Sequence, residues 1–451
     1  MNGAAPRRAP ADLRRFKPYP EYKDSGVEWL GEVPAHWEVI RLAELTTLLN
    51  GYPFDSEYFV RGDGTPLVRI RDLYENETEV NYIGPAVNDA WIAHGDVIIG
   101  MDGDFNVARW KGPRALLNQR MCCLRPRSPN DGGFIAYILP FPLKVINDLT
   151  YSTTVKHLSS LDVRKIRVGS PPREEQRDIA AFLDRETARI DALVAKKKRL
   201  IELLQEKRAV LITRAVTKGL DPNVPMKDSG AERLGEVPAH WEVYALRRRL
   251  FREAGSIKIG PFGSQLKLEL MTKEGFKVYG QEHVIARDFG RGNKYVDLGR
   301  FTELAACEIR PYDLVVTMMG SSGRCAVVPE GIERGIMDSH LLRVRLRNCD
   351  LDPTYLCLLI DESAYVRDQI EASGKGAIML GLNSNIIKSL LLAVPPASEQ
   401  RKILSFLDRE TAKIDALIAK VRDAVDRLNE LSTALISAAV TGRIDVRGEV
   451  A

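Results

Sequence analysis

Few side chains in this sequence have the types and spacing that catalysis requires. Asp102 and Asp104 form an acidic pair that could bind a metal or exchange protons, but no companion histidine or lysine is spaced to support them. Gly374-Lys375-Gly376 lacks the upstream glycine and the downstream hydroxyl of a phosphate-binding loop. The motifs G-x-G-x-x-G, H-E-x-x-H and G-x-S-x-G do not occur. We therefore expect no catalytic residue and no metal site, and read the two aspartates as turn residues.

The composition indicates an ordinary soluble chain. It has 451 residues, of which 45% are hydrophobic and 28% charged, and its 65 basic and 61 acidic residues leave a net charge of +4. No apolar run has the length of a membrane span, and the six cysteines form no C-x-x-C pair. We expect a cytoplasmic protein of about three units whose cysteines are core thiols.

The strongest feature is an internal repeat. Residues 30–39 (LGEVPAHWEV) recur unchanged as residues 234–243, each copy shortly after Lys-Asp-Ser-Gly. A second repeated segment begins at Pro171-Pro172 and again at Pro395-Pro396, and it includes F-L-D-R-E-T at 182–187 and 406–411. The offset grows from 204 to 224 residues, so the second block between these segments is 20 residues longer. Two copies of one frame thus enclose two different blocks.

Each Pro-Pro segment is expected to open a helix of about 40 residues, roughly 60 Å long. The helices should end near 217–219 and 441–442, and apolar residues recur in them at spacings of 3 and 4, as in a coiled coil. We expect the helices to pair with each other; the alternative is that each folds back on its own block. The predicted seam consists of Ile179, Leu183, Ile190, Leu193, Leu200, Leu204, Leu211, Ile403, Leu407, Ile414, Leu417, Val421, Leu428, Leu431 and Leu435.

The blocks between the frames have the pattern of mixed α/β domains. Strands are expected at 67–71, 96–100, 313–317 and 341–345, with glycine turns at 51–53, 102–104, 260–263 and 320–323. The predicted fold class is α+β, with two mixed α/β domains joined by two long helices in an antiparallel coiled coil and related by a pseudo-two-fold repeat. The predicted divisions are 1–170, 171–219, 220–394 and 395–451.

These motifs together resemble the specificity subunit of type I restriction-modification systems. The resemblance rests on L-G-x-V-P-x-H-W, G-x-P-F-x-S from Gly51, G-D-V-I-I-G-M-D-G-D-F at 95–105, L-N-Q-R at 117–120, P-P-x-x-E-Q-R and F-L-D-R-E-T. The second block departs from it, with GPFGS at 260–264 in place of the G-x-P-F-x-S motif and MDSH at 337–340 where the first block has LNQR at 117–120.

The resemblance implies that each block is a target recognition domain for double-stranded DNA. It also implies that the helices space the two domains and dock two methyltransferase subunits. Restriction subunits would be further partners, and S-adenosylmethionine, ATP and magnesium would be used by the partners. The chain itself would be a non-catalytic subunit that recognises a split, asymmetric sequence.

Arginine pairs with guanine, and asparagine or glutamine with adenine, through two hydrogen bonds, so such residues on turns are the expected base contacts. The first block is slightly acidic, with 12 basic and 14 acidic residues over 40–160, and the second is mildly basic, with 21 and 18 over 244–392. Candidates in the first block are Arg69, Arg71, Asn118, Gln119 and Arg120, with Lys156 and His157 near phosphate. Candidates in the second are Ser264, Gln265, Gln281, His283, Ser321, Ser322, Arg324, His340 and Lys375.

Other residues have simpler interpretations. Trp37 and Trp241 are expected to anchor the core of the repeated leader. The run 196–199 is expected to be a solvated helix face, because 420–423 has no equivalent. Glu186 and Glu410, at the same position in both copies, either set the register of the helices or mark a docking site. Two rival functions remain open: a coiled-coil adaptor whose heads bind proteins, and a nucleic-acid enzyme with an unrecognised site.

Overall fold

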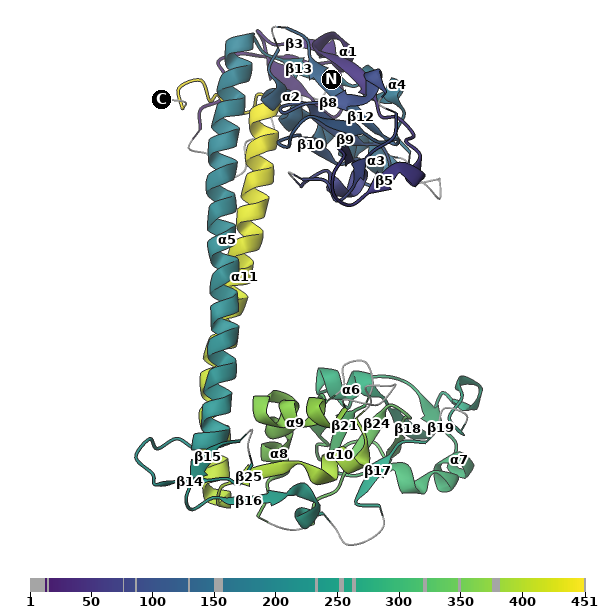
Figure 1. Cartoon of the computed structure of the whole chain (residues 1–451), viewed down its shortest axis with the longest axis vertical. Coiled ribbons are helices and arrows are strands. Elements are labelled where there is room, and N and C mark those ends of the chain that lie inside the picture. Colours follow the sequence, from purple (N-terminus) through teal and green to yellow (C-terminus); the bar gives the residue numbers. More distant parts are fainter. Residues whose placement is uncertain are drawn as a thin grey trace, which may run out of the picture. The chain divides into compact units, whose positions relative to one another are not determined.

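The computed structural model describes Leu13 and residues 16–75, 77–85, 87–128, 130–149, 157–231, 234–250, 255–261, 265–318, 323–347, 350–374 and 382–449. The chain divides into two compact units. Unit 1 is Met1–Lys198 with Arg422–Ala451, and unit 2 is Arg199–Val421. Two long helices, α5 (Arg173–Lys218) and α11 (Ala397–Val440), are shared between the units: one part of each helix belongs to unit 1 and the other part to unit 2 (Figure 1).

Unit 1 is built on two main sheets. One has the order β10-β9-β12-β4 and the other β5-β7-β6-β11-β8, in which β6 and β11 are parallel. The remaining strands form two small antiparallel pairs, β1 with β2 and β13 with β3. The elements are β1 (Tyr22–Asp24), β2 (Glu32–Pro34), β3 (Glu38–Arg41), α1 (Leu42–Leu45), β4 (Thr46–Asn50), β5 (Phe59–Val60), β6 (Thr65–Val68), β7 (Asn81–Tyr82), β8 (Trp91–Ile92), β9 (Val97–Gly100), β10 (Val107–Arg109), β11 (Ala115–Leu117), β12 (Met121–Pro126), α2 (Gly132–Ile138), α3 (Pro140–Leu149), α4 (Ser160–Lys165) and β13 (Arg167–Ser170).

Unit 2 repeats this topology. Its main sheets have the orders β17-β24-β21-β22 and β19-β18-β23-β20, with β18 and β23 parallel, and β14 pairs with β15 as β16 does with β25. The elements are β14 (Met226–Asp228), β15 (Glu236–Pro238), β16 (Glu242–Ala245), β17 (Ile257–Ile259), β18 (Phe276–Tyr279), α6 (Gln281–Ala286), β19 (Tyr295–Val296), α7 (Leu298–Glu303), β20 (Glu308–Ile309), β21 (Leu314–Thr317), β22 (Cys325–Val327), β23 (Gly335–Met337), β24 (Leu341–Val344), α8 (Pro353–Glu362), α9 (Ala364–Gly374), α10 (Ser384–Ser389) and β25 (Leu391–Val394).

We name residues 42–166 head 1 and residues 246–390 head 2. When the four-stranded sheet of head 1 is read in reverse, β4-β12-β9-β10 matches β17-β24-β21-β22 of head 2. In the other sheets, β7-β6-β11-β8 matches β19-β18-β23-β20 without reversal. The two heads thus share one sheet order although their sequences share no long identical stretch. The predicted α+β class and internal repeat are confirmed.

The repeated leader anchors each head to the start of a long helix. Trp37 and Trp241 are fully buried, as predicted, because each indole lies inside the core that its leader shares with the head. The helices begin directly after the Pro-Pro segments. They end just before Gly219 and Gly442, whose φ values of 74° and 70° are the left-handed conformation that closes helices.

The long helices pair antiparallel within each unit. Ile190 and Val194 of α5 pack with Val425 of α11 in unit 1, and Leu204 packs with Ile414 and Ile418 in unit 2. The alternative, that each helix packs on its own block, is partly true as well. The first turns of each helix pack into the hydrophobic core of a head: Ile179 and Leu183 in head 1, Ile403 and Leu407 in head 2.

Three of the predicted seam residues are wrong. Leu193, Leu200 and Leu417 are 41%, 41% and 44% exposed, whereas their neighbours Val194, Ile201 and Ile418 join the helix contacts. At about 100° per residue, Val194 and Ile201 lie about 40° and 20° around the helix from Ile190, but Leu193 and Leu200 lie about 60° and 80° away on its other side. The other predicted seam residues are buried or half-buried: Ile179, Leu183, Ile190, Leu204, Leu211, Ile403, Leu407, Ile414, Val421, Leu428, Leu431 and Leu435.

Three of the four predicted strands are present as β9, β21 and β24. The fourth is wrong beyond Val68: residues 69–71 leave β6 and enter a 3-10 turn, Ile70–Asp72. The cause is Asp72, whose carboxylate accepts the main-chain N–H of Arg69 and closes the turn. The five cysteines that the structure describes are buried thiols, as expected. In the described part of the chain, no helix has both the length and the apolar character to cross a membrane.

Candidate functional site

In head 1, the ends of four strands meet at one edge of the two sheets. Main-chain hydrogen bonds fix them together: Gly51 N to Met121 O (2.9 Å), Tyr52 N to Leu117 O (2.9 Å), Asn118 N to Val68 O (3.0 Å) and Met101 N to Arg120 O (2.9 Å). We name this the turn edge of head 1. It comprises Asn50–Tyr52, Arg69–Arg71, Asp102, Asn118–Arg120 and His157.

Head 2 has a corresponding edge, built from three of the four main-chain bonds; the bond from Tyr52 N has no counterpart, because Pro261 lacks an N–H. Gly260 N donates to Leu341 O, Asp338 N to Tyr279 O and Met318 N to His340 O, each at 2.9 Å. The turn edge of head 2 comprises Ile259–Pro261, Gly280–His283, Met318 and Asp338–His340. This arrangement confirms the predicted equivalence of residues 117–120 with 337–340, although their side chains differ.

One glycine in each head lets the edge close. A Cβ atom on Gly51 would lie 1.8 Å from the carbonyl oxygen of Asn118, and one on Gly260 would lie 1.6 Å from that of Asp338. Neither glycine has a positive φ. The close approach of two main chains therefore explains why the turn predicted at 51–53 and the one predicted at 260–263 both begin with glycine.

Two candidates of head 1 converge on Asp102. Its Oδ2 lies 2.7 Å from Nη1 of Arg120, and its Oδ1 lies 2.8 Å from Nδ1 of His157. Burial alone would raise the pKa of Asp102, but the hydrogen bonds from His157 and Arg120 outweigh it and hold that pKa below its ordinary value. Asp102 is a turn residue as predicted, but its role in holding both candidates was missed, since only the sheet register brings 102, 120 and 157 together.

The other candidates of head 1 differ in availability. Arg71 and Gln119 are exposed, and Asn118 is half-buried with its Oδ1 lacking a hydrogen-bond partner in the described structure. Arg69 is only 16% exposed and donates to Asp72 at 3.0 Å and to Glu79 at 2.8 Å. Its bond with Asp72 is the main cause of its raised pKa. Arg69 therefore stabilises the turn and is a poor candidate for a base contact.

Tyr52 was missed as a candidate. It lies at the turn edge, is 44% exposed and stacks edge-on against Phe54 at 5.1 Å. Its position inside the Gly51-Tyr52-Pro53-Phe54 segment was a usable signal, because exposed aromatic rings on turns can stack on bases or sugars.

In head 2 the prediction for His283 conflicts with its burial. The ring is 1% exposed; Nδ1 accepts the main-chain N–H of Gly280 (2.9 Å), and Nε2 lies 2.9 Å from the carbonyl oxygen of Arg291. It occupies the place of Asp72 in head 1, where a carboxylate bonds the corresponding N–H. His283 is thus a capping residue of α6 and does not reach the surface.

The remaining candidates of head 2 lie at or near the turn edge. His340 is half-exposed, Gln281 is the half-buried first residue of α6, and Gln265 is exposed. Arg324 bonds the main chain of Thr317 beside the edge and pairs with the buried carboxylate of Asp361 at 3.2 Å. Lys156, Ser264, Ser321, Ser322 and Lys375 lie outside the described residues.

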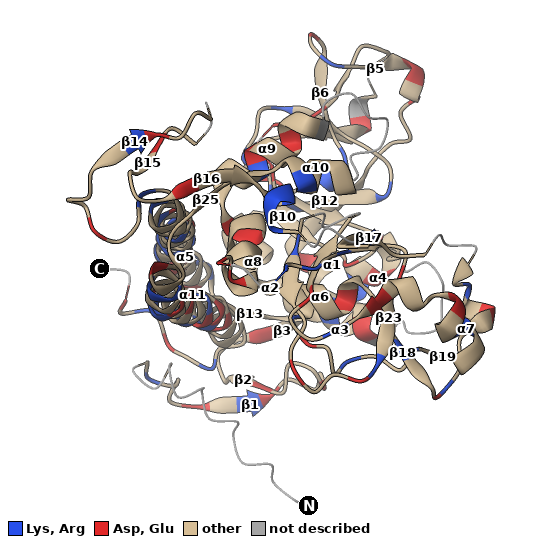
Figure 2. Cartoon of the chain, turned by 90° about the horizontal axis from the view of Figure 1, so that it is seen from below, with Lys and Arg blue, Asp and Glu red and all other residues tan. Residues whose placement is uncertain are grey.

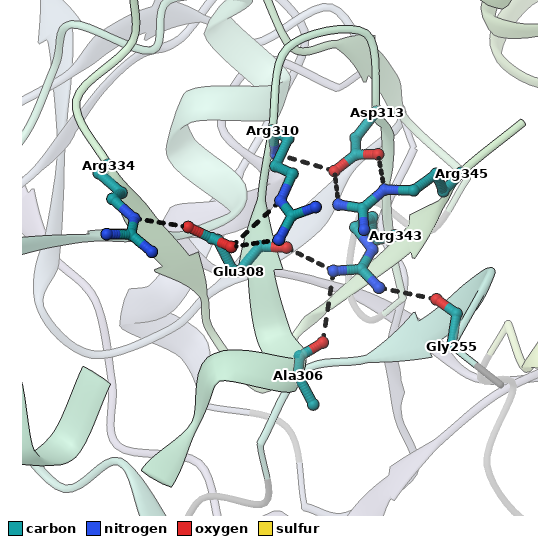
Figure 3. Close-up of polar contacts among 8 residues, drawn as sticks. All are labelled: Gly255, Ala306, Glu308, Arg310, Asp313, Arg334, Arg343 and Arg345. Atoms are coloured by element: carbon teal, nitrogen blue, oxygen red, sulfur yellow. Dashed lines mark hydrogen bonds and ion pairs between the residues drawn. The ribbon is translucent and has the colours of Figure 1, made fainter. Parts of the chain in front are cut away.

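Several of the basic residues of head 2 form ion pairs within the head. The Glu308 carboxylate pairs with Arg334 at 2.8 Å and with Arg310 at 2.9 Å, and Asp313 pairs with Arg345 at 2.6 Å (Figure 3). Burial alone would raise the pKa of Glu308, but its bonds with Arg334 and Arg310 lower it. This cluster lies at the end of β23 opposite the turn edge, since Arg334 precedes that strand and Asp338 follows it.

Arg343 in the same cluster is buried, and its guanidinium donates to three main-chain carbonyls: Ala306, Glu308 and Gly255 (Figure 3). Burial lowers its pKa. Along α5 and α11 basic and acidic residues are interspersed (Figure 2). Neither the cluster nor the two helices therefore form a simple basic surface in the described part of the chain.

Comparison with known proteins shows which proteins this chain is similar to. Residues 34–203 match the family model described as the Type I restriction modification DNA specificity domain. The chain is 27% identical over 439 residues to the specificity subunit of the type I restriction enzyme EcoBI of Escherichia coli, covering 94% of this chain and 90% of that one. It is 21% identical to the EcoKI specificity subunit of Escherichia coli, covering 92% and 90%.

Its fold matches a chain from a structure of a type I R-M system, solved to explain complex assembly and conformational transition, with a TM-score of 0.67 at 16% identity. The match covers 90% of this chain and 98% of that one. The matched residues 34–203 include head 1, and head 2 repeats the sheet order of head 1 outside the matched range. Over most of its length the chain is thus similar to specificity subunits of type I restriction enzymes, and residues 34–203 match the model of the DNA specificity domain.

Proposed function

We propose that this chain selects the DNA sequence on which a type I restriction-modification complex acts, each head contacting one half of a split, asymmetric target. The observation that carries this proposal is the pair of turn edges. Three equivalent main-chain bonds are present in both, but Asn118, Gln119 and Arg120 in head 1 correspond to Asp338, Ser339 and His340 in head 2. Two frames of one shape with different donors and acceptors suit two different half-sites.

The chain carries out no chemistry itself in this proposal. The curated relatives are named specificity subunits. Methyltransferase subunits would transfer the methyl group from S-adenosylmethionine, and restriction subunits would use ATP and magnesium. The complex would act in the cytoplasm, where its DNA is found.

The long helices supply the surface on which two methyltransferase subunits would dock. Leu193 and Leu417 occupy the same repeat position, and both are exposed although each neighbours a residue of the helix seam. Leu200, Leu203 and Val210 are also exposed on α5. A large apolar side chain kept exposed at the same place in both copies suits one partner that binds twice. The pairing of α5 with α11 would also set the spacer between the half-sites.

The test is methylation by the assembled complex. The full chain is combined with its methyltransferase partner and S-adenosylmethionine, a library of random duplexes is added, and methylated adenines are mapped. We expect one split motif. Exchanging residues 40–165 for the corresponding block of another family member should replace one half of that motif and leave the other unchanged.

The results also separate the rival functions. Assembly with a partner but no dependence of methylation on DNA sequence would favour a protein-binding adaptor. Modification or cleavage of DNA by the chain without any partner would identify an enzyme. A change in both halves of the motif after the exchange would contradict the division of labour between the heads.

A further inference from the structure

Asp102 holds Arg120 in a defined position at the turn edge of head 1. The carboxylate is 19% exposed; one oxygen binds Arg120 Nη1 at 2.7 Å, and the other binds the His157 ring at 2.8 Å. Because both oxygens have a partner, the carboxylate is fixed in orientation. An arginine bound to such a carboxylate loses side-chain freedom before any ligand arrives, which lowers the entropic cost of binding.

The main chain at Arg120 is fixed as well. Its φ is +64°, in the left-handed region that a side chain other than glycine rarely adopts. The conformation is imposed by the turn between β11 and β12, because Arg120 O accepts from Met101 N (2.9 Å) and Asn118 N donates to Val68 O (3.0 Å). The fold thus directs a strained arginine outward at the edge where four strands end.

Arg120 keeps most of its hydrogen-bonding capacity. Its side chain is 62% exposed, and among the described residues Asp102 is the one hydrogen-bond partner of its guanidinium. A guanidinium has five N–H donors in a planar fork. With Nη1 held by Asp102, the Nε and Nη2 groups have no partner among the described residues. Guanine accepts such a pair of donors through O6 and N7.

We propose that Arg120 reads a guanine in the half-site of head 1, with Asp102 as the positioning residue that holds the guanidinium in place. The inference rests on the DNA-reading role proposed above and adds a base to it. His157 acts through Asp102 by holding its second oxygen. Arg69, another arginine of this edge, is not equivalent, since its guanidinium is hydrogen-bonded to Asp72 and Glu79.

Head 2 provides the internal comparison. The place of Arg120 is taken by His340, whose carbonyl accepts from Met318 N as that of Arg120 accepts from Met101 N. The nearby carboxylate belongs to Asp338, and its Oδ1 accepts the main-chain N–H of His340 at 2.9 Å. Head 2 has no guanidinium at this position and should not read guanine there.

The experiment measures methylation by the complete complex on duplexes in which each base pair of the established motif is changed in turn. The half-site of head 1 is first assigned by the exchange of residues 40–165. The variants are Arg120→Ala, Arg120→Lys and Asp102→Asn, with His340→Ala as the matched control in the other head. Thermal unfolding of each assembled complex shows whether the variant is folded.

We expect Arg120→Ala to lower the preference for guanine at one base pair of that half-site by about 10-fold or more, the discrimination of one two-pronged contact. Arg120→Lys should not restore it, because an ammonium lacks the fork. Asp102→Asn should weaken the same preference less, at the same base pair. His340→Ala should leave it unchanged.

Three results would overturn the assignment. The first is an unchanged base preference at every base pair in folded Arg120→Lys and Asp102→Asn complexes. The second is a uniform loss of methylation on all duplexes in the Arg120 variants, which would indicate a phosphate contact, and the third is an altered head 1 preference in His340→Ala. Each leaves the DNA-reading role standing as long as the unmodified complex methylates a split motif. If that complex shows no sequence preference, the proposed function itself fails.

Discussion

Nε2 of His36 lies 2.8 Å from Oε2 of Glu175, and the same contact recurs at 2.8 Å between His240 and Glu399. These four residues belong to the repeated segments H-W and P-P-x-x-E-Q, which are far apart in the sequence. The contact fastens each leader to the first turn of a long helix. It explains why the leader and the helix start were duplicated together.

Removing Glu175 should destabilise the protein more than removing Glu399. Oε1 of Glu175 also accepts from Trp37 Nε1 (2.8 Å) and from the Tyr19 hydroxyl (2.7 Å), whereas Trp241 Nε1 is buried without a hydrogen-bond partner in the described structure. Glu175→Ala would leave two buried donors, Trp37 Nε1 and the Tyr19 hydroxyl, without an acceptor. We expect this to lower the free energy of unfolding by about 3 kcal/mol. Chemical denaturation of both alanine variants measures the difference, and equal losses would contradict it.

The close approach at Gly51 predicts a sharp effect of a single methyl group. Gly51→Ala would place Cβ 1.8 Å from Asn118 O and force the turn edge apart, so we expect a loss of at least about 2 kcal/mol and disturbed base preference in one half-site. Gly100→Ala is the control, because its Cβ would meet Ile70 at an ordinary 3.7 Å. Thermal unfolding and methylation mapping of both variants test this; equal behaviour would show that the turn can yield.

The exposed and buried faces of the long helices should separate assembly from stability. Leu193→Ala with Leu417→Ala should change the free energy of unfolding by less than about 0.5 kcal/mol per site but weaken assembly with the methyltransferase subunit. Val194→Ala with Ile418→Ala should cost about 2 kcal/mol per site, because those side chains fill the contact between α5 and α11. Unfolding curves and sedimentation with the partner give both quantities. Normal assembly of the leucine variant would exclude these leucines from the docking surface.

The ion pairs of Glu308 should make the stability of head 2 depend on pH in the acid range. Its pKa in the folded protein is lowered, so its contribution to stability is complete above the pKa of the unfolded chain, about 4.3, and is lost as the pH falls through the lower folded value. Glu308→Gln should therefore be less stable than the unchanged protein at pH 7, with the difference shrinking below about pH 4. Denaturant titrations from pH 3 to 7 check the sign, and a difference that stays constant would refute it.

The repeat and the long helices could be predicted because identical residues and apolar spacing are visible in one sequence. The phase of the helix seam could not be, since Leu193 and Val194 both fit spacings of 3 and 4 and only the geometry of the pair selects between them. The spacing predicts leucine in the seam at 193, 200 and 417, but the β-branched neighbours Val194, Ile201 and Ile418 face the partner helix.

The turns that form the candidate site could be predicted from the sequence. The partners of their side chains could not. Arg69 and Arg120 look alike in the sequence, yet one is tied to Asp72 three residues away and the other to Asp102 across two strands. His283 resembles a surface histidine but replaces an aspartate as a cap. Such roles depend on which strand ends meet, and this register is set by long-range pairing that residue types do not reveal.

Main-chain hydrogen bonds join the strand ends at both turn edges. Asn118 and Asp338 donate through their backbone N–H, and Arg120 and His340 accept through their carbonyl oxygens. Mutations at these positions can consequently alter what is displayed without breaking the scaffold that displays it. A lineage carrying this architecture could acquire new sequence preferences in one head by a few substitutions, at little risk to folding and with the inherited preference of the other head intact.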